Sequence, residues 1–170
     1  NGDITVPSGS IKLSESGQGI NFHNFGSGSG VTSNLLDDYE EGTFTPVVRA
    51  YFNSAWRDSA FDTSPTEATG FYTKVGNLVF ICGRVRGFDL NSDSTGSYAG
   101  FGGLPFTAKT GTLYPVIDTF YNSAMADGYA GFYIGASSTL AYTARQNSAQ
   151  GHTTWNSGTV EFWYYSSYYT

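Results

Sequence analysis

Two tryptophans stand among polar residues, where an aromatic ring could take part in recognition. Trp56 lies in the segment NSAWRD at residues 53–58, and Trp155 precedes Asn156 in the segment HTTWN. Sugars stack their C–H faces on aromatic rings while their hydroxyl groups bond to planar polar groups. The pattern predicts a glycan-binding surface at Trp56, Trp155 and Asn156. Loop tryptophans also cover the ends of a sandwich or fill subunit interfaces, and that alternative stays open.

Residue types that carry catalysis or bind metals are sparse. His23 and His152 have no second histidine or cysteine at ligand spacing, so we expect no zinc site. Residues 89–96 match a calcium loop at the first alternate positions, but Ser94 and Gly100 stand where Gly and Glu are needed. A hairpin loop with side chain–backbone hydrogen bonds explains that segment better. We therefore predict no catalytic residue, no metal and no cofactor, and hence a protein that is not an enzyme.

The only dense charge cluster lies at residues 37–41, where four carboxylates occur within five positions. This segment could form one helical turn, with Ser33 or Asn34 as its N-cap and Gly42 as its stop. Adjacent carboxylates without other oxygen ligands bind metal ions weakly. We therefore interpret the cluster as a solvated acidic connector.

Charge and cysteine content narrow the possible partners. The net charge is −6, so a phosphate backbone would be repelled, and among eight cations only Arg84 and Arg86 lie close together. Cys82, the single cysteine, follows apolar residues and is expected to be buried. No apolar run approaches the ~18 residues of a membrane span. We predict no nucleic-acid binding, no membrane insertion and no disulfide framework.

Aromatic residues dominate the apolar content and indicate a β fold. The chain has 13 Phe, 13 Tyr and 3 Trp, more than its Leu, Ile and Val together, and such a composition favours strands over long helices. Residues 78–82 are apolar at every position, which predicts a central strand buried on both faces. Phe80, Phe162 and Tyr164 are expected to fill the core. The sequence predicts an antiparallel β-sandwich or jelly roll, with a hairpin at 68–88 that turns at Gly76-Asn77 and strands near residues 43–52, 98–101, 111–120, 129–136, 140–145 and 159–165.

The chain divides by composition near residue 34. Residues 1–34 contain short apolar pieces at 4–6, 10–14 and 19–22, followed by a Gly/Ser-rich linker at 24–30. Two or three apolar side chains per piece cannot close a core alone. We predict a thin stalk segment at 1–34 and a β-sandwich head at 35–170. Because the chain starts at Asn1 without Met, we expect a fragment of something longer.

Four segments in order carry a resemblance to a known family. Residues 35–46 (LLDDYEEGTFTP) resemble the LDDYEEGTWTP segment of bacteriophage tail-fibre and related virion proteins. Residues 70–79 resemble their GxYTKIGNxV hairpin, residues 103–108 (GLPFTA) their GLPF turn, and residues 3–22 their lead-in. Phe44 replaces a frequent Trp, and the chain from about residue 111 has no counterpart.

The resemblance implies a virion protein at the particle surface, a homotrimer with an intertwined stalk and a head. Its partners would be copies of itself, other virion proteins and a bacterial surface glycan or protein, bound multivalently. A purely structural capsid-decoration or fibril subunit, and a carbohydrate-binding module of a secreted enzyme, remain alternatives. A glycan-degrading tailspike is disfavoured, because tailspike catalytic domains are usually much longer repeats.

Overall fold

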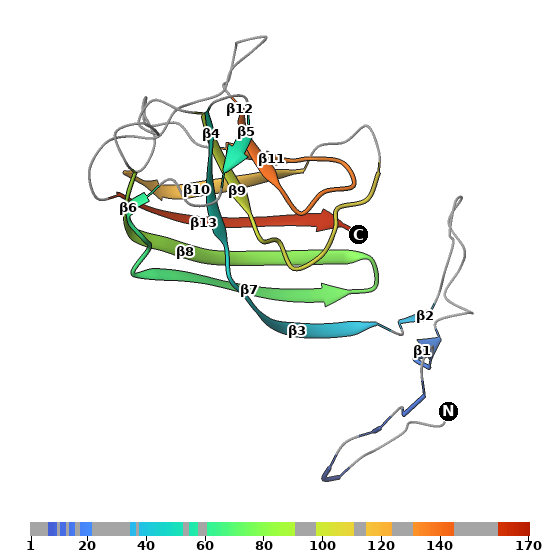
Figure 1. The fold of residues 1–170 in the computed structure, drawn as a ribbon. Helices are drawn as coiled ribbons and strands as arrows, with labels where there is room; N and C mark the ends of the chain where they lie inside the picture. Colours follow the sequence, from blue (N-terminus) through green and yellow to red (C-terminus); the bar gives the residue numbers. More distant parts are fainter. Residues whose placement is uncertain are drawn as a thin grey trace.

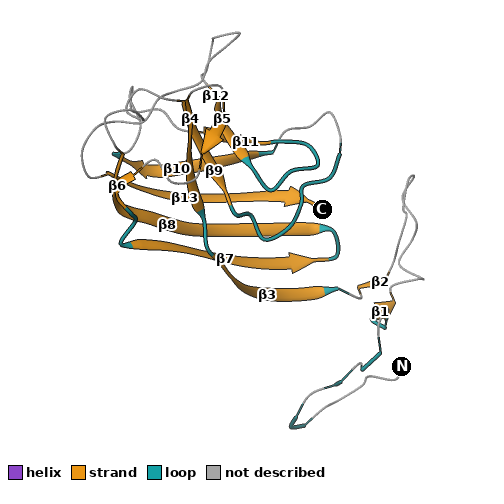
Figure 2. Cartoon of the chain, in the orientation of Figure 1, coloured by secondary structure: helices purple, strands orange, loops and turns teal. Residues whose placement is uncertain are grey.

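The computed structural model describes residues 7–9, 11–12, 14–15, 18–21, 35–36, 38–52, 55–57, 61–90, 98–110, 115–123, 131–144 and 160–170. Every regular secondary-structure element in these ranges is a β-strand (Figure 2), so the predicted all-β class is confirmed. The strands are β1 (Ile20–Asn21), β2 (Leu35–Leu36), β3 (Tyr39–Phe44), β4 (Val47–Phe52), β5 (Ala55–Arg57), β6 (Phe61–Thr63), β7 (Glu67–Val75), β8 (Leu78–Leu90), β9 (Tyr98–Gly102), β10 (Val116–Asn122), β11 (Gly131–Ile134), β12 (Ala141–Ala144) and β13 (Val160–Tyr169).

One antiparallel sheet of eleven described strands curls into two layers, in the order β3-β7-β8-β13-β10-β11-β12-β9-β4-β5, with β6 beside β8. We call β3, β7, β8, β13 and β10 the long-strand layer and the other five strands of that order the short-strand layer. Strands β4 and β9 cross β8 and β13 at a steep angle (Figure 1). The two layers enclose one core, as the predicted sandwich-like class requires.

The acidic segment forms an edge strand, and the predicted helical turn is wrong. Strand β3 pairs with β7 along its whole length, from Tyr39 opposite Val75 to Phe44 opposite Gly70. Pairing with a neighbouring strand satisfies the backbone groups that a single helical turn would leave open. After Pro46 the chain continues as β4 in the other layer, so β3 and β4 connect the two layers directly.

The predicted hairpin is confirmed. Strands β7 and β8 pair from Glu67 opposite Arg86 to Val75 opposite Leu78, and Gly76 in the turn has φ +56°. Positive φ at the first turn residue fits the mirror-image turns that follow the twist of two strands. The strands expected at 98–101, 129–136, 140–145 and 159–165 correspond to β9, β11, β12 and β13 with shifted ends. Strand β10 begins at Val116, inside the range expected for it, whereas β5 and β6 were not predicted.

Aromatic rings fill the space between the layers. Phe101 on β9 lies 4.8 Å from Tyr164 and 6.0 Å from Phe162 on β13, measured between ring centroids, and Phe132 on β11 lies 5.9 Å from Phe162. All four side chains are fully buried. Edge-to-face and tilted pairs of this kind add stability beyond the burial of area. The expectation that Phe162 and Tyr164 fill a core short of aliphatic residues is confirmed.

Tyr168 ties the segment 103–108 to this core. Its hydroxyl donates to the Phe106 carbonyl at 3.1 Å and accepts from the Phe106 amide at 3.3 Å. Burial raises the pKa of Tyr168 to about 12, so the phenol stays protonated as a donor. Leu104 and Ala108 are buried on either side of this anchor.

Strands β1 and β2 pair with each other, Ile20 opposite Leu36, and lie beyond the end of β3, away from the large sheet (Figure 1). Residues 4–6 and the Gly/Ser-rich residues 24–30 lie outside the described residues. The division at residue 34 and the stalk role of the first segment stay predictions.

Candidate functional site

One side of the long-strand layer is covered by the core, and the other side carries a set of exposed rings. Side chains alternate along each strand, so Val79 and Ile81 of β8 are buried while Phe80 is 47% exposed. The expected burial of β8 on both faces is therefore wrong, and so is the expected burial of Phe80 and of Cys82, which is exposed. We call the exposed set the aromatic face: Tyr39, Phe71, Val75, Phe80, Val116, Trp163, Tyr165 and Tyr169.

Strand register places these side chains in neighbouring rows. Phe71 of β7 lies opposite Cys82 of β8, Cys82 opposite Tyr165 of β13, and Tyr165 opposite Asp118 of β10. Cross-strand neighbours on one face of a sheet stand within ~4.5–5.5 Å of each other at Cβ. Cys82 therefore lies in the middle of the aromatic face, between a phenylalanine and a tyrosine.

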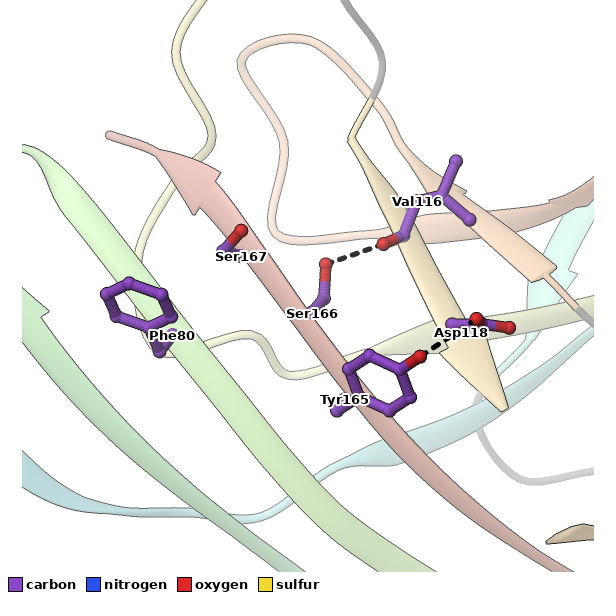
Figure 3. Close-up of a pocket in the computed structure, with 6 residues that line it drawn as sticks. All are labelled: Phe80, Val116, Asp118, Tyr165, Ser166 and Ser167. Atoms are coloured by element: carbon purple, nitrogen blue, oxygen red, sulfur yellow. Dashed lines mark hydrogen bonds between the residues drawn. The ribbon is translucent and has the colours of Figure 1, made fainter. Parts of the chain in front are cut away.

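A hollow of about 580 Å³ opens on one side of the aromatic face, between β8, β13 and β10 (Figure 3). The Tyr165 hydroxyl donates to Asp118 Oδ2 at 3.1 Å, and this hydrogen bond raises the pKa of Tyr165. The Ser166 hydroxyl donates to the Val116 carbonyl at 2.7 Å. Figure 3 shows both bonds running from β13 to β10. The hollow is lined by Phe80, Val116, Asp118, Tyr165, Ser166 and Ser167.

The other side of the face ends in a cluster of charges. Arg84 Nε donates to Glu67 Oε1 at 3.1 Å, and Arg86 Nε lies 2.9 Å from Glu67 Oε2. The hydrogen bond from Arg84 lowers the pKa of Glu67. The Arg84 guanidinium also lies 5.0 Å from the centre of the Trp163 ring, while the Trp163 indole N–H donates to Glu161. Two arginines and two glutamates thus balance one another beside a tryptophan.

The exposed side chains of this face offer a broad apolar contact surface. Within the described residues, no group of three or more His, Cys, Asp or Glu side chains could hold a metal ion. Several polar side chains on the face bond to one another, including Tyr39 to Glu41. In the same part of the chain, no helix is long and apolar enough to cross a membrane.

The described residues of this face include none of the predicted glycan-binding residues. Trp56 lies in strand β5 opposite Tyr51, so its expected place in a loop is wrong. Its side chain, and Trp155 and Asn156 entirely, lie outside what the structure describes. Their ligand-binding role stays a prediction.

The aromatic face itself was missed, although the sequence carried a signal for it. In β13, Phe162, Tyr164 and Tyr168 are buried while Trp163, Tyr165 and Tyr169 are exposed. Rings at both odd and even positions of a strand exceed what one buried face can take. That excess indicates a second apolar face, whose side chains are exposed in the described part of the chain.

Neither the known protein-family models nor the curated proteins include a match to this sequence. What the geometry defines is a class: an all-β, sandwich-like domain with an aromatic face that is exposed among the described residues.

Proposed function

We propose that this chain is a structural and adhesive module of a bacteriophage virion, the end of a homotrimeric fibre that binds a bacterial surface glycan or protein. The sequence resemblance over residues 3–22, 35–46, 70–79 and 103–108 motivates the proposal. The observation that carries it is the aromatic face, since monomers rarely expose contiguous apolar patches larger than a few hundred Å². An assembly of several chains gives such a face a use.

Binding would work by multivalency. Each head would bind its receptor weakly, and several heads held on one fibre would raise the avidity by orders of magnitude without any new contact. The β1–β2 pair outside the main sheet is consistent with a thin connection between the head and the rest of a fibre.

The test is the binding of the purified, fluorescently tagged chain to a panel of bacterial strains, followed by flow cytometry. We expect saturable binding to a restricted set of strains, competed by the purified surface polysaccharide or removed by protease treatment of the cells. Those two treatments distinguish a glycan receptor from a protein receptor.

The two tryptophans that the sequence predicts to bind sugar are tested in the same assay. Trp56→Ala and Trp155→Ala should each weaken binding about tenfold, the loss of ~1.4 kcal/mol, if these rings stack on a sugar. Tyr142→Ala, which removes a ring from the short-strand layer, is the matched control and should bind as the wild type does. An oligomeric chain that binds no strain would instead favour the purely structural virion subunit.

A further inference from the structure

The aromatic face has the size of a protein interface. An aromatic side chain presents roughly 150–250 Å², so six rings that are 36–64% exposed leave on the order of 600 Å² in solvent. Val75 and Val116 add to this area. A standard interface covers ~800 Å² on each partner. The aromatic face approaches this area even before the polar residues around its edge are counted.

The chemistry of the face favours protein over sugar. A sugar site needs polar groups that are ready to bond to hydroxyls beside the stacking ring. Here the polar groups bond within the face: Tyr165 to Asp118, Trp163 to Glu161, and Arg84 to Glu67. Much of what remains to be covered is apolar surface, which is typical of the fully buried part of an interface between subunits.

The distribution of charge allows the partner to be a second copy. The chain carries a net charge of −6, so two copies repel unless their contact avoids acidic side chains. Along β8, the positions between Leu78 and Cys82 carry no charge. Glu41 and Asp118 stand on β3 and β10, the outermost strands of the long-strand layer. The charged end of the face is balanced by Arg84 and Arg86.

We propose that the aromatic face is the surface through which copies of this chain pack against one another. The inference rests on the proposed function for the idea of several copies in one fibre end, and it names the surface that joins them. Its test is separate: cell binding tests the receptor, whereas mass and cysteine labelling test the face.

Cys82 is a built-in probe, because it is the only cysteine and lies at the centre of the face. The full chain at about 10 µM should sediment as a multiple of 18.3 kDa. A maleimide should label Cys82 at least about tenfold more slowly than in the variant Phe80→Asp. Phe80→Asp and Phe71→Asp should each weaken association at least about thirtyfold, as expected for charging the centre of an interface.

Two controls separate assembly from folding. Phe80→Leu keeps an apolar side chain and should keep the assembly, and Tyr142→Asp places the same charge on the short-strand layer and should also keep it. An 18.3 kDa wild type with Cys82 labelled as fast as in Phe80→Asp would overturn the proposal. An oligomer that persists in both Phe80→Asp and Phe71→Asp would also overturn it. So would a monomer whose Cys82 becomes protected only when polysaccharide is added.

Discussion

Gly70 and Gly83 lie opposite each other in β7 and β8 and leave room for two rings of the core. A Cβ on Gly70 would come within 2.4 Å of the Phe44 ring. A Cβ on Gly83 would come within 2.3 Å of the Tyr164 hydroxyl and 2.2 Å of the Thr69 carbonyl. Glycine in a strand often marks such a close approach, and here it is what allows aromatic rings to lie against the backbone.

Alanine at these positions should destabilise the fold to different, testable extents. Gly70→Ala should lower the free energy of unfolding by about 1–3 kcal/mol, the usual cost of overpacking. Phe44→Leu should recover part of that loss in the double variant, because the three atoms nearest the new Cβ all belong to the Phe44 side chain. Urea unfolding of the four proteins in this cycle measures the coupling.

Gly83→Ala is the comparison that shows whether rescue depends on which atoms the new Cβ meets. Its added Cβ meets the Thr69 carbonyl, which is backbone and does not move with a side-chain change. Tyr164→Phe should therefore not rescue Gly83→Ala. Equal rescue at both sites would contradict the packing described here.

Between strands, the Glu67–Arg84–Arg86 cluster makes the fold sensitive to acid. The hydrogen bond from Arg84 holds the pKa of Glu67 below its ordinary value of 4.5. A carboxyl whose pKa is lower in the folded state stabilises the fold above its unfolded pKa, and that contribution is lost as the pH falls through its folded pKa. Glu67→Gln should therefore be less stable than the wild type at neutral pH, with the difference narrowing below pH 4.5.

Urea unfolding from about pH 7 to about pH 3 checks this at one fixed protein concentration. Glu15→Gln removes an exposed carboxylate outside the large sheet and should leave the curve unchanged. A Glu67→Gln difference that stays constant with pH would show that lost packing, not ionisation, causes it.

Most strands of the large sheet could be predicted from local patterns. The Gly76-Asn77 turn between two apolar segments defined the β7–β8 hairpin, and short segments between turn signals, at residues 98–101 and 140–145, located β9 and β12. The acidic segment was predicted wrongly because glutamate, the residue type at positions 40 and 41, is common in helices. The pairing of these residues with β7 is a long-range contact. Strand partners about 30 residues apart cannot be recognised from the local sequence pattern alone.

The aromatic face could be predicted only in part. An apolar run such as Leu78–Cys82 says that both sides of a strand avoid water, but not whether a second layer of the same chain or another molecule provides the cover. The structure places one layer over Val79 and Ile81 and none of the described chain over Phe80. The candidate sugar residues Trp56 and Trp155 were chosen by polar neighbours, a criterion that exposed rings on strands do not meet.

For the molecule as a whole, assembly and stability should be coupled. If folded chains associate while unfolded chains do not, mass action makes the thermal midpoint depend on protein concentration. We expect the midpoint of the wild type to rise over a hundredfold increase in concentration, and the midpoint of Phe80→Asp to stay constant. Calorimetry at both ends of that range checks it, and a wild-type midpoint independent of concentration would contradict coupling.

The position of β13 sets the order in which the large sheet can form. Strand β13 lies between β8 and β10, so the two neighbours it joins are about 30 residues apart in the chain and both precede it. A ribosome makes those neighbours first, and each waits with one open edge until residues 160–169 have left the exit tunnel. Synthesis from the N-terminus therefore cannot complete this sheet stepwise, because β8 and β10 gain their shared neighbour only after β13 has emerged, and the resulting pairing has a high contact order.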